Sequence, residues 1–483
     1  MKILMISAEG PPLQRAGALI DVMDALPNAL RARGHEISVV VPFYREIKEN
    51  RAFKKKNTGI TVDVQVGDKV YVARYLERRS ASGVQLFLIR CDEFFDRPGI
   101  YGERGKAYED NAARFIFFCK AALELARRLT PQLQVLHVHD WAAALVPVFV
   151  HAQRLPFKTV LTIHHVADQG SFWGLDFALT NLPERFFTLH GVEFFGRLNF
   201  LKGGILYSDK ITTVSEHYRR EILTPAGGYG LDGVLRENAH RLTAILHGAD
   251  YARWNPASDR LLPARYDARR PRGKETCRDA LLKQLKLASA PRGPVFGMVT
   301  RLVEEKGFEI LMPLLDRLLW DDVRLIILGE GDPAYETALA VASRKFRTKF
   351  AYLKNYDEKL AHLIEAGMDI TLIPSRFEPA GLSAMYSLKY GALPVARATG
   401  GIQEIIEDYD PTADSGYGFL CYEYSTEAFW DAIKRARGIF RDRNVWTTLM
   451  KRAMARSFSW GAAAQSYEAL YKELIGADDQ VAA

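Results

Sequence analysis

The sequence has few cysteines and no long apolar run. Its four cysteines lie far apart in the 483 residues, without a CxxC spacing between any two, at Cys91, Cys119, Cys277 and Cys421. This distribution argues against a disulfide framework and a zinc site, and it suits a reducing compartment. The apolar runs, such as Ala142–Val150, are shorter than the roughly 18 residues that a membrane-spanning helix needs. Because the N-terminus also resembles a first strand more than a signal peptide, we expect a cytoplasmic protein with no membrane partner.

Charge of one sign is not concentrated either. The chain has 65 Lys and Arg residues against 58 Asp and Glu, which gives a formal net charge of +7 at pH 7. A nucleic-acid-binding surface would need this excess gathered on one face. The densest basic stretch, Arg265–Arg292, holds nine basic and three acidic residues, but Leu281, Leu282 and Leu285 recur in it at helical spacing. This spacing favours a surface helix, so nucleic acid is not an expected partner.

Repeats and low-complexity segments are absent as well. Hydrophobic residues make up 48% of the chain and charged residues 25%, which is the balance of an average globular protein. The 36 glycines and 21 prolines follow no period, so neither a collagen-like nor a linker-like chain is indicated. At about 150 residues per domain the length would fit three domains, and two large α/β domains fit it equally well.

Strand and helix patterns alternate from the first residue onward. Lys2–Ser7 and Glu36–Pro42 predict buried strands, and the apolar residues between Leu19 and Leu30 fall on one helical face. Further buried strands are expected at Val135–His139, Thr159–Ile163, Lys210–Val214, Thr243–Leu246, Val295–Val299, Arg324–Leu328, Phe350–Leu353, Ile370–Ile373 and Leu393–Ala396. Val62–Arg90 is expected to add antiparallel strands at a sheet edge. Strands that alternate with helices predict an α/β protein with mainly parallel, doubly wound sheets.

The chain changes character near residue 250. The stretch from Asp250 to Pro294 is rich in proline and arginine, and a second series of strands and helices begins after it. We therefore place a domain boundary near residues 250–260 and predict two doubly wound domains with a cleft between them. In such sheets ligands bind outside the carboxyl ends of the strands, so functional residues are expected in the loops that follow strands.

Three loops of the first domain carry candidate residues. Arg15 adds a positive charge just before a predicted helix, whose N-terminus favours an anion, although an ordinary strand–helix turn is the alternative. Asp140 can hold a hydroxyl, and Trp141 can pack against a sugar or a base. His164 and His165 are adjacent on a loop, but no third or fourth ligand at suitable spacing accompanies them. A metal site is therefore not expected.

The loops of the second domain carry a more specific set. Arg301 and Lys306 follow a strand, and side chains of both types bind phosphate oxygens. Glu378 stands before Pro379 at the expected start of a helix, beside N–H groups that have no helical partner. Thr399–Gly401 follows the next strand. Polar loops on the same side of two sheets predict a ligand site at the cleft.

Several of these residues lie within longer motifs that resemble one enzyme family. The motifs are Asp96-Arg-Pro-Gly, His137-Val-His-Asp-Trp, Arg301-Leu-Val-Glu-Glu-Lys-Gly, Ser375-Arg-Phe-Glu-Pro-Ala-Gly-Leu, Lys389-Tyr-Gly-Ala-Leu-Pro and Thr399-Gly-Gly. Through them the chain resembles, nearly end to end, the bacterial glycogen synthase and plant starch synthase family of retaining glycosyltransferases. The resemblance implies a GT-B fold with two Rossmann-like domains facing a central cleft. It also implies transfer of glucose from ADP-glucose to the non-reducing end of an α-1,4-glucan such as glycogen, without a metal or other cofactor.

The resemblance also implies roles for single residues. Arg301 and Lys306 would bind the leaving diphosphate, and Glu378 would hold sugar hydroxyls beside the anomeric carbon. His164 and Asp140 would line the glucosyl pocket. Donor binding would further involve Arg15, Gly17, Asp21, His165, His247, Gly381, Leu382, Thr399, Gly400 and Gly401. These roles agree with the chemistry, because glycosyl transfer leaves negative charge on the diphosphate and fixed cations stabilise that charge.

The family organisation divides the chain into three parts. Residues 1–250 would form the first domain, with the acceptor side and part of the donor site. Residues 251–457 would form the nucleotide-sugar-binding domain. Residues 458–483 would form a C-terminal helix that packs back onto the first domain.

The sequence departs from the family pattern at six positions, namely Arg15, Ala18, Ala142, His165, His247 and Ala380. The pattern has Lys, Gly, His, Asn, Asn and Cys there. The departures at Arg15, His165 and His247 touch the expected donor site, so they bear on donor choice and turnover more than on fold. Two alternatives are a GT-B transferase with another nucleotide-sugar or acceptor, and a non-catalytic glucan-binding paralogue. Arg301 and Lys306 argue against the paralogue, since a pure binder has no use for diphosphate cations.

Overall fold

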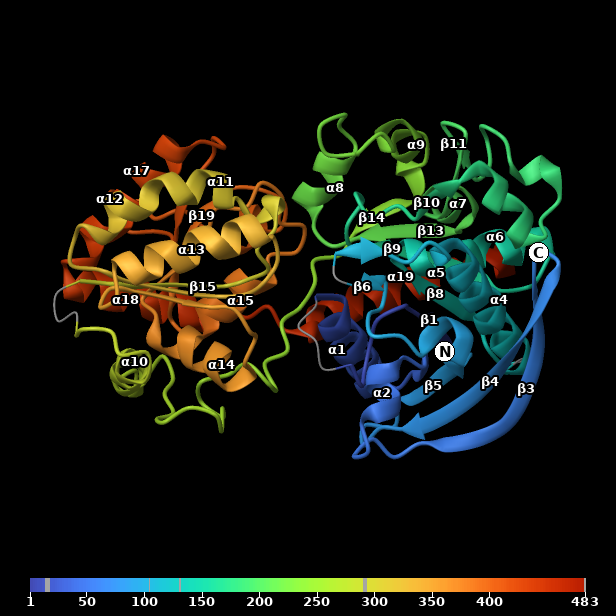
Figure 1. The fold of residues 1–483 in the computed structure, drawn as a ribbon, viewed down its shortest axis with the longest axis horizontal. Coiled ribbons are helices and arrows are strands. Elements are labelled where there is room, and N and C mark those ends of the chain that lie inside the picture. Colours follow the sequence, from blue (N-terminus) through green and yellow to red (C-terminus); the bar gives the residue numbers. More distant parts are fainter. Residues whose placement is uncertain (14–17, 104, 130–131, 290–292, 482–483) are drawn as a thin grey trace. The chain divides into compact units, whose positions relative to one another are not determined.

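The computed structural model of the protein describes residues 1–13, 18–103, 105–129, 132–289 and 293–481. The chain divides into two units, which Figure 1 shows as ribbons. Unit 1 comprises Met1–Leu246 and Trp460–Ala483, and unit 2 comprises His247–Ser459. The chain therefore passes between the units twice, near residues 246 and 459.

Unit 1 is built on a sheet with the strand order β14-β13-β9-β8-β1-β2-β5-β4-β3. Its strands are β1 (Lys2–Ile6), β2 (Glu36–Pro42), β3 (Lys56–Val66), β4 (Lys69–Arg79), β5 (Gln85–Arg90), β8 (Val135–His139), β9 (Lys158–Ile163), β13 (Lys210–Thr213) and β14 (Leu242–Ala244). Neighbouring strands from β14 to β5 are parallel, whereas β4 is antiparallel to both β5 and β3. The prediction of antiparallel strands at a sheet edge is therefore confirmed.

Helices cover this sheet, and short strands form smaller additions. The helices are α1 (Ala18–Ala32), α2 (Arg45–Glu49), α3 (Asp92–Phe95), α4 (Asn111–Leu129), α5 (Asp140–Ala143), α6 (Leu145–Ala152), α7 (Phe200–Tyr207), α8 (Glu216–Ile222), α9 (Asp232–Glu237) and α19 (Trp460–Val481). The short 3-10 helices are η1 (Gly174–Thr180), η2 (Glu184–Phe186) and η3 (Ala239–Arg241). A small antiparallel sheet has the order β10-β12-β11, with β10 (Ser171–Trp173), β12 (Arg197–Asn199) and β11 (Glu193–Phe194). A two-stranded hairpin pairs β6 (Gly102–Glu103) with β7 (Lys106–Ala107).

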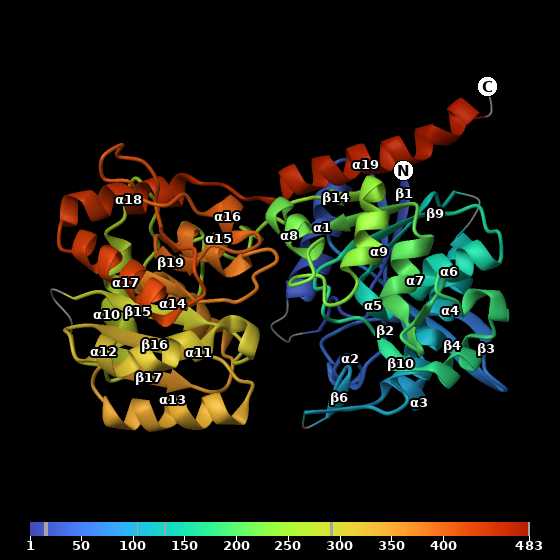
Figure 2. The same ribbon diagram turned by 90° about the horizontal axis from the view of Figure 1, so that it is seen from above.

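The last helix of the chain completes the core of unit 1. Figure 2 shows α19 running along the unit beside α1. Tyr467 and Tyr471 of α19 are fully buried, and the Tyr471 hydroxyl lies 2.7 Å from Nδ1 of His137 in β8. In α1 the apolar residues that share one helical face are buried, as their spacing predicts: Leu19, Val22, Met23, Leu26 and Leu30.

Unit 2 contains a parallel sheet with the strand order β17-β16-β15-β18-β19-β20. Its strands are β15 (Val295–Val299), β16 (Arg324–Leu328), β17 (Phe350–Leu353), β18 (Ile370–Ile373), β19 (Leu393–Arg397) and β20 (Phe419–Cys421). Counted from the first strand of the unit this is the order 3-2-1-4-5-6, the order of a Rossmann fold. The chain reverses its direction of progress between β15 and β18, and a ligand site is expected there.

The helices of unit 2 flank this sheet. They are α10 (Gly273–Gln284), α11 (Phe308–Leu311), α12 (Leu315–Leu319), α13 (Pro333–Lys345), α14 (Glu358–Gly367), α15 (Leu382–Lys389), α16 (Ile402–Ile405), α17 (Thr426–Phe440) and α18 (Arg443–Ala455), and the 3-10 helices are η4 (Glu304–Lys306) and η5 (Met312–Leu314). The middle of the basic stretch forms α10, whose Leu281 and Leu282 are buried, and Leu285 is the C-cap residue of this helix. The prediction of a surface helix with one apolar side is therefore confirmed.

The two segments that connect the units are bonded to each other within unit 2. The N–H group of Ala249 donates to the carbonyl of Phe458 at 2.6 Å, and Ala249 forms a parallel β-bridge with Ser459. The hydroxyl of Tyr251 accepts a hydrogen bond from the N–H group of Phe458 at 3.2 Å. In the described chain, no helix has the length and apolarity that crossing a membrane requires.

Candidate active site

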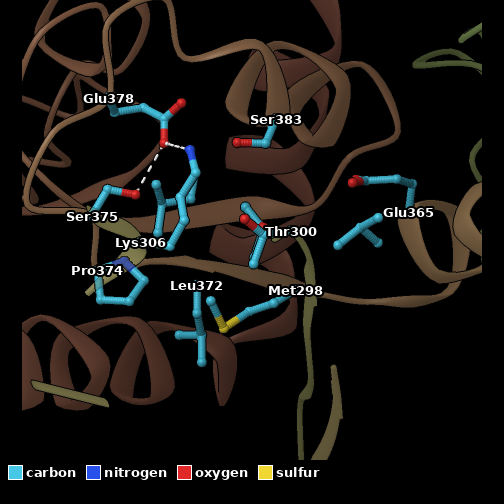
Figure 3. A pocket seen from close by; sticks show the side chains of 12 residues that line it. Met298, Thr300, Lys306, Glu365, Leu372, Pro374, Ser375, Glu378 and Ser383 are labelled. Carbon is cyan, nitrogen blue, oxygen red and sulfur yellow. Dashed lines mark hydrogen bonds and ion pairs between the residues drawn. The ribbon is translucent and has the colours of Figure 1, made fainter. Parts of the chain in front are cut away.

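A pocket in unit 2 lies at the carboxyl ends of β15 and β18, where the strand order reverses. Figure 3 shows the side chains of Lys306 and Glu378 pointing toward each other in this pocket. Nζ of Lys306 lies 2.6 Å from Oε2 of Glu378, and the Ser375 hydroxyl donates to the same oxygen at 3.0 Å. Both members of the ion pair are largely buried. The pocket thus holds a cation and a carboxylate in a fixed arrangement.

Backbone hydrogen bonds hold together the loops that carry this pair. The N–H group of Arg376 donates to the carbonyl of Glu305 at 2.8 Å, and that of Gly401 donates to the carbonyl of Glu378 at 3.1 Å. Gly400 has a φ of +45°, and a Cβ there would clash with the carbonyl of Glu378. Only glycine therefore allows the loop after β19 to approach the loop after β18 so closely.

Helix α15 begins next to the ion pair. Its N-cap residue is Gly381, which has no side chain to bond to the first N–H groups of the helix. Leu382 is its first residue, and Ser383 lines the pocket. The first turn of a helix carries unpaired N–H groups and a partial positive charge. This end of α15 is therefore suited to an anion, as is the ammonium group of Lys306.

Arg301 lies on the same loop, directly after Thr300 of the pocket lining, and its side chain is exposed. Among the residues that the structure describes, its guanidinium forms no hydrogen bond or ion pair. The nearby Glu304 pairs with Arg376 instead, at 3.3 Å. The guanidinium donors of Arg301 are thus available to a ligand.

Two further polar residues belong to this pocket, and the loop pattern of the sequence does not single them out. Ser375 stands three residues before Glu378 and is the first residue of the same motif, so the motif could have indicated Ser375 as a site residue. Glu365 lies on α14, accepts a hydrogen bond from the Ser387 hydroxyl at 2.9 Å, and is buried. Burial raises the pKa of Glu365 to about 8. Its position in a regular helix gives no sequence signal for a site residue.

Asp140 and His164 meet in unit 1, at the carboxyl ends of β8 and β9. Oδ1 of Asp140 accepts a hydrogen bond from the backbone N–H of His164 at 2.7 Å. Asp140 has a φ of +56°, a left-handed conformation that Asp tolerates better than most residues. Nε2 of His164 lies 3.0 Å from Nδ1 of His139, a buried partner that the loop-based prediction missed because it lies within a strand.

Desolvation sets the protonation of these groups. Burial lowers the pKa values of His164 and His137 to about 3 in each case. Burial raises the pKa of Asp140 to about 8, and the hydrogen bond from His164 opposes part of this rise. His164 is therefore neutral at physiological pH and can exchange a hydrogen bond with an uncharged hydroxyl.

The remaining predicted residues are less closely grouped. Asp21 lies in the first turn of α1, and Nδ1 of His165 lies 3.3 Å from Oδ2 of Asp168. His247 is buried and is the first residue of unit 2. Arg15 and Gly17 lie outside the described residues. Among the described side chains, no group of three or more His, Cys, Asp or Glu residues is placed to hold a metal ion.

Comparison with known proteins places the chain in a family. The family model "Starch synthase catalytic domain" matches residues 2–237, and the model "Glycosyl transferases group 1" matches residues 283–437. The glycogen synthase of Opitutus terrae is 40% identical, over 98% of this chain and 100% of the relative. The glycogen synthase of Anaeromyxobacter sp. (strain Fw109-5) is 42% identical, over 98% and 99%. The chain belongs to the glycogen and starch synthase family.

Solved structures agree with the family assignment of this synthase. The catalytic domain of starch synthase IV from Arabidopsis thaliana, bound to ADP and acarbose, superimposes with a TM-score of 0.91 and 31% identity, over 98% of this chain and 99% of that chain. Sucrose-phosphate synthase from Thermosynechococcus elongatus has a TM-score of 0.60 at 16% identity, over 99% of each chain, and this likeness concerns the fold alone. This synthase is a glycosyltransferase, and its two Rossmann-like domains form a GT-B fold.

Proposed function

We propose that this synthase transfers glucose from ADP-glucose to the non-reducing end of an α-1,4-glucan, with retention of configuration and without a metal or other cofactor. The observation that carries the proposal is the Lys306–Glu378 ion pair beside the first turn of α15. It combines a cation for a leaving phosphate with a carboxylate for sugar hydroxyls. Such a combination suits a donor that is part anion and part sugar.

Unit 2 supplies the proposed donor site. The ammonium group of Lys306 has three N–H donors, one of which faces Glu378, so the others can bind phosphate oxygens. Arg301 and the first turn of α15 add further donors. As the glycosidic bond breaks, negative charge grows on the departing diphosphate, and fixed cations stabilise this charge more in the transition state than in the ground state. The glycines of Thr399–Gly401 let the backbone approach the same ligand.

Unit 1 supplies the proposed glucosyl floor and the acceptor side. Neutral His164 would bind a sugar hydroxyl, and Asp140 would fix the backbone of His164. Arg15, Gly17, Asp21, His165 and His247 complete the proposed donor contacts. Because neither unit contains the whole set, the reaction would require residues of both.

The proposed sugar nucleotide and the proposed cellular location rest on separate arguments. The starch synthase IV neighbour was solved with ADP and acarbose, a nucleoside diphosphate and an oligosaccharide mimic, which supports ADP-glucose and an α-glucan as substrates here. The cysteines at 91, 119, 277 and 421 are all free and buried, which supports a cytoplasmic location.

A donor panel tests the proposal. Purified protein would receive ADP-glucose or UDP-glucose with glycogen as acceptor, and release of nucleoside diphosphate and growth of the glucan would be measured. We expect turnover with ADP-glucose that exceeds turnover with UDP-glucose, in the presence and in the absence of EDTA. A preference for UDP-glucose would indicate that the departures at His165 and His247 change the donor specificity. Glucan binding without turnover of either donor would favour the non-catalytic alternative.

A further inference from the structure

Several large apolar side chains of unit 1 are exposed within a short stretch of chain. Of the large apolar residues that are exposed in the described chain, four lie between residues 173 and 195, namely Trp173, Leu175, Leu189 and Phe195. Trp173 is 64% exposed and Phe195 is 86% exposed. We call the two exposed rings, Trp173 and Phe195, the aromatic patch. Scattered exposed apolar residues need no explanation, but a cluster that includes two large rings marks an interaction surface.

The small sheet carries both rings of the aromatic patch. Trp173 at the end of β10 is paired with Arg197 of β12, and Arg197 is paired on its other side with Phe194 of β11. Phe195 directly follows Phe194 in the turn between β11 and β12, and their rings are 4.7 Å apart. Trp173 and Arg197 are both exposed, so one row of the sheet presents an indole and a guanidinium to solvent.

Phe195 occupies a backbone position that is unfavourable for it. The two residues of this hairpin turn, Phe195 and Gly196, have φ values of +50° and +74°. Two-residue turns with both φ values positive favour Asn-Gly, since Asn tolerates this conformation and bulky residues do not. The turn thus holds a strained phenylalanine whose ring contributes little to the core. Strain of this kind is concentrated at positions where the side chain serves binding.

The small sheet that carries the aromatic patch packs on α5, the helix that begins at Asp140. Phe172, the neighbour of Trp173 in β10, faces the opposite side of the small sheet, where its ring lies 5.7 Å from that of Trp141. Trp141 follows Asp140 in the chain, and a Cβ at Gly170 would clash with the Trp141 ring. Strand β10 is therefore packed directly on the first turn of α5. A polymer that is bound at the patch would lie on the same unit as the proposed glucosyl floor.

We propose that the aromatic patch is a glucan-binding surface that holds a chain of the polymeric acceptor. Aromatic rings pack against the C–H faces of sugar rings, as the exposed rings of Trp173 and Phe195 can do. The Arg197 guanidinium beside Trp173 donates to Ser171 at 2.9 Å and 3.1 Å, and it keeps further N–H donors for sugar hydroxyls. Stable subunit interfaces bury roughly 800 Å² on each partner with an apolar centre, whereas here the charged Arg197 is the strand partner of Trp173. This inference rests on the proposed function in taking an α-glucan as the acceptor.

The test measures glucan binding without catalysis. Full-length protein, Trp173→Ala, Phe195→Asn and the double variant would be run on native gels with increasing glycogen, and retardation would give the dissociation constant. We expect roughly tenfold weaker binding for each single variant and a larger loss for the double variant. Trp320→Ala is the matched control, because Trp320 lies in unit 2 and is 83% exposed. Its retardation should equal that of the parent protein.

Kinetics and stability separate this proposal from its alternatives. With ADP-glucose, the variants should show a raised KM for glycogen but unchanged turnover of a short acceptor such as maltotriose. Phe195→Asn should raise the melting temperature, because Asn relieves the strain that the ring imposes on the turn. Parent-like glycogen retardation in both folded single variants would overturn the proposal, and so would a shift from dimer to monomer in sedimentation without any loss of glycogen binding. The parent protein could turn over no ADP-glucose while glycogen still retarded the parent and not the variants. The proposed function would then be wrong, and the proposed glucan-binding surface would be supported.

Discussion

At the scale of single residues, the site depends on one shared oxygen atom. Oε2 of Glu378 is bonded both to the Lys306 ammonium and to the Ser375 hydroxyl. Two donors on one carboxylate oxygen fix the direction of the Glu378 side chain. The second oxygen of Glu378 forms no hydrogen bond with the residues that the structure describes, so it is available to the proposed donor. The same ion pair holds Lys306 in position for an anion, so each of the two residues orients the other.

Removal of the proposed diphosphate cations should slow the chemical step. We expect Lys306→Ala and Arg301→Ala each to lower kcat by about 10²–10³ with the fold retained, because each takes a positive charge from the departing diphosphate. Steady-state kinetics with ADP-glucose and glycogen, together with circular dichroism, would measure this. Lys359→Ala is a suitable control, since Lys359 is an exposed lysine of unit 2 away from the pocket. Near-normal turnover in both variants would show that the cations do not act on the leaving group.

The imidazoles at 165 and 247 should affect the donor more than the acceptor. His165 contacts Asp168, and His247 is buried at the start of unit 2. We expect His165→Asn and His247→Asn to change the KM for the sugar nucleotide while the affinity for glycogen stays the same. Comparison of ADP-glucose and UDP-glucose kinetics in the two variants would measure the effect. Unchanged donor kinetics in a folded double variant would show that these two departures do not affect donor recognition.

At the scale of elements, buried strands were the most predictable part of the fold. Strands β15, β16, β17 and β18 have the bounds that the sequence predicts, because parallel strands covered on both faces are continuous apolar runs between polar loops. The same logic predicted that Lys306 and Glu378 come after strands, and they follow β15 and β18. It did not predict their hydrogen bond, which joins residues 72 positions apart and depends on the order of the strands in the sheet.

Other elements and contacts could not be predicted, because the local sequence pattern that would indicate them is too weak. Strands β10, β11 and β12 have only two or three residues each, so no alternation can be recognised. Their hairpin has Phe-Gly where Asn-Gly would indicate the turn. The contact between Tyr471 and His137 spans 334 positions, and nothing in the local pattern of either segment indicates it. His139 was missed as a partner of His164 for the related reason that strand residues are expected to be structural.

Because α19 packs on β8 and buries His137, we expect the free energy of unfolding to fall at acidic pH. The folded-state pKa of His137 is about 3, below the usual value of 6.5, because the ring is buried. A group whose pKa is lowered by folding binds its proton more readily in the unfolded chain. The free energy of unfolding is therefore highest above pH 6.5 and falls as the pH drops from 6.5 toward 3, by up to about 1.4 kcal/mol per pH unit for this one group.

His137→Gln isolates this contribution. Glutamine keeps an uncharged polar side chain toward Thr162 and Tyr471, the partners of the imidazole, but it does not titrate. His164 adds a slope of the same sign and Asp140 one of the opposite sign, because burial lowers the pKa of the former and raises that of the latter. Both of these slopes cancel when the free energy of unfolding of the variant is subtracted from that of the parent at each pH. Urea unfolding at pH 7, 6 and 5 should show a smaller loss of stability in the variant, and parallel losses would contradict the role of His137.

At the scale of the whole molecule, two chain segments connect the units, and they are bonded to each other. Ala249 pairs with Phe458 and Ser459, and Tyr251 accepts a hydrogen bond from Phe458. Because α19 belongs to unit 1 while the rest of the second half forms unit 2, both segments must bend together if the units move. We infer that Gly248–Pro256 and Phe458–Gly461 act as one double hinge.

Ligands that bind both units should therefore change the dimensions of the protein. The proposed cations Arg301 and Lys306 lie in unit 2, and His164 and Asp140 lie in unit 1, so a donor and an acceptor bound together favour the arrangement in which both sets reach them. Closure would also exclude water, strengthen each contact with the diphosphate and limit hydrolysis of the donor. Small-angle scattering of the active protein with saturating ADP and a maltooligosaccharide should show a smaller radius of gyration than the free protein. Lys306→Ala should need a higher ADP concentration for the same change. An unchanged radius at saturation, in protein that is active and open when free, would count against the double hinge.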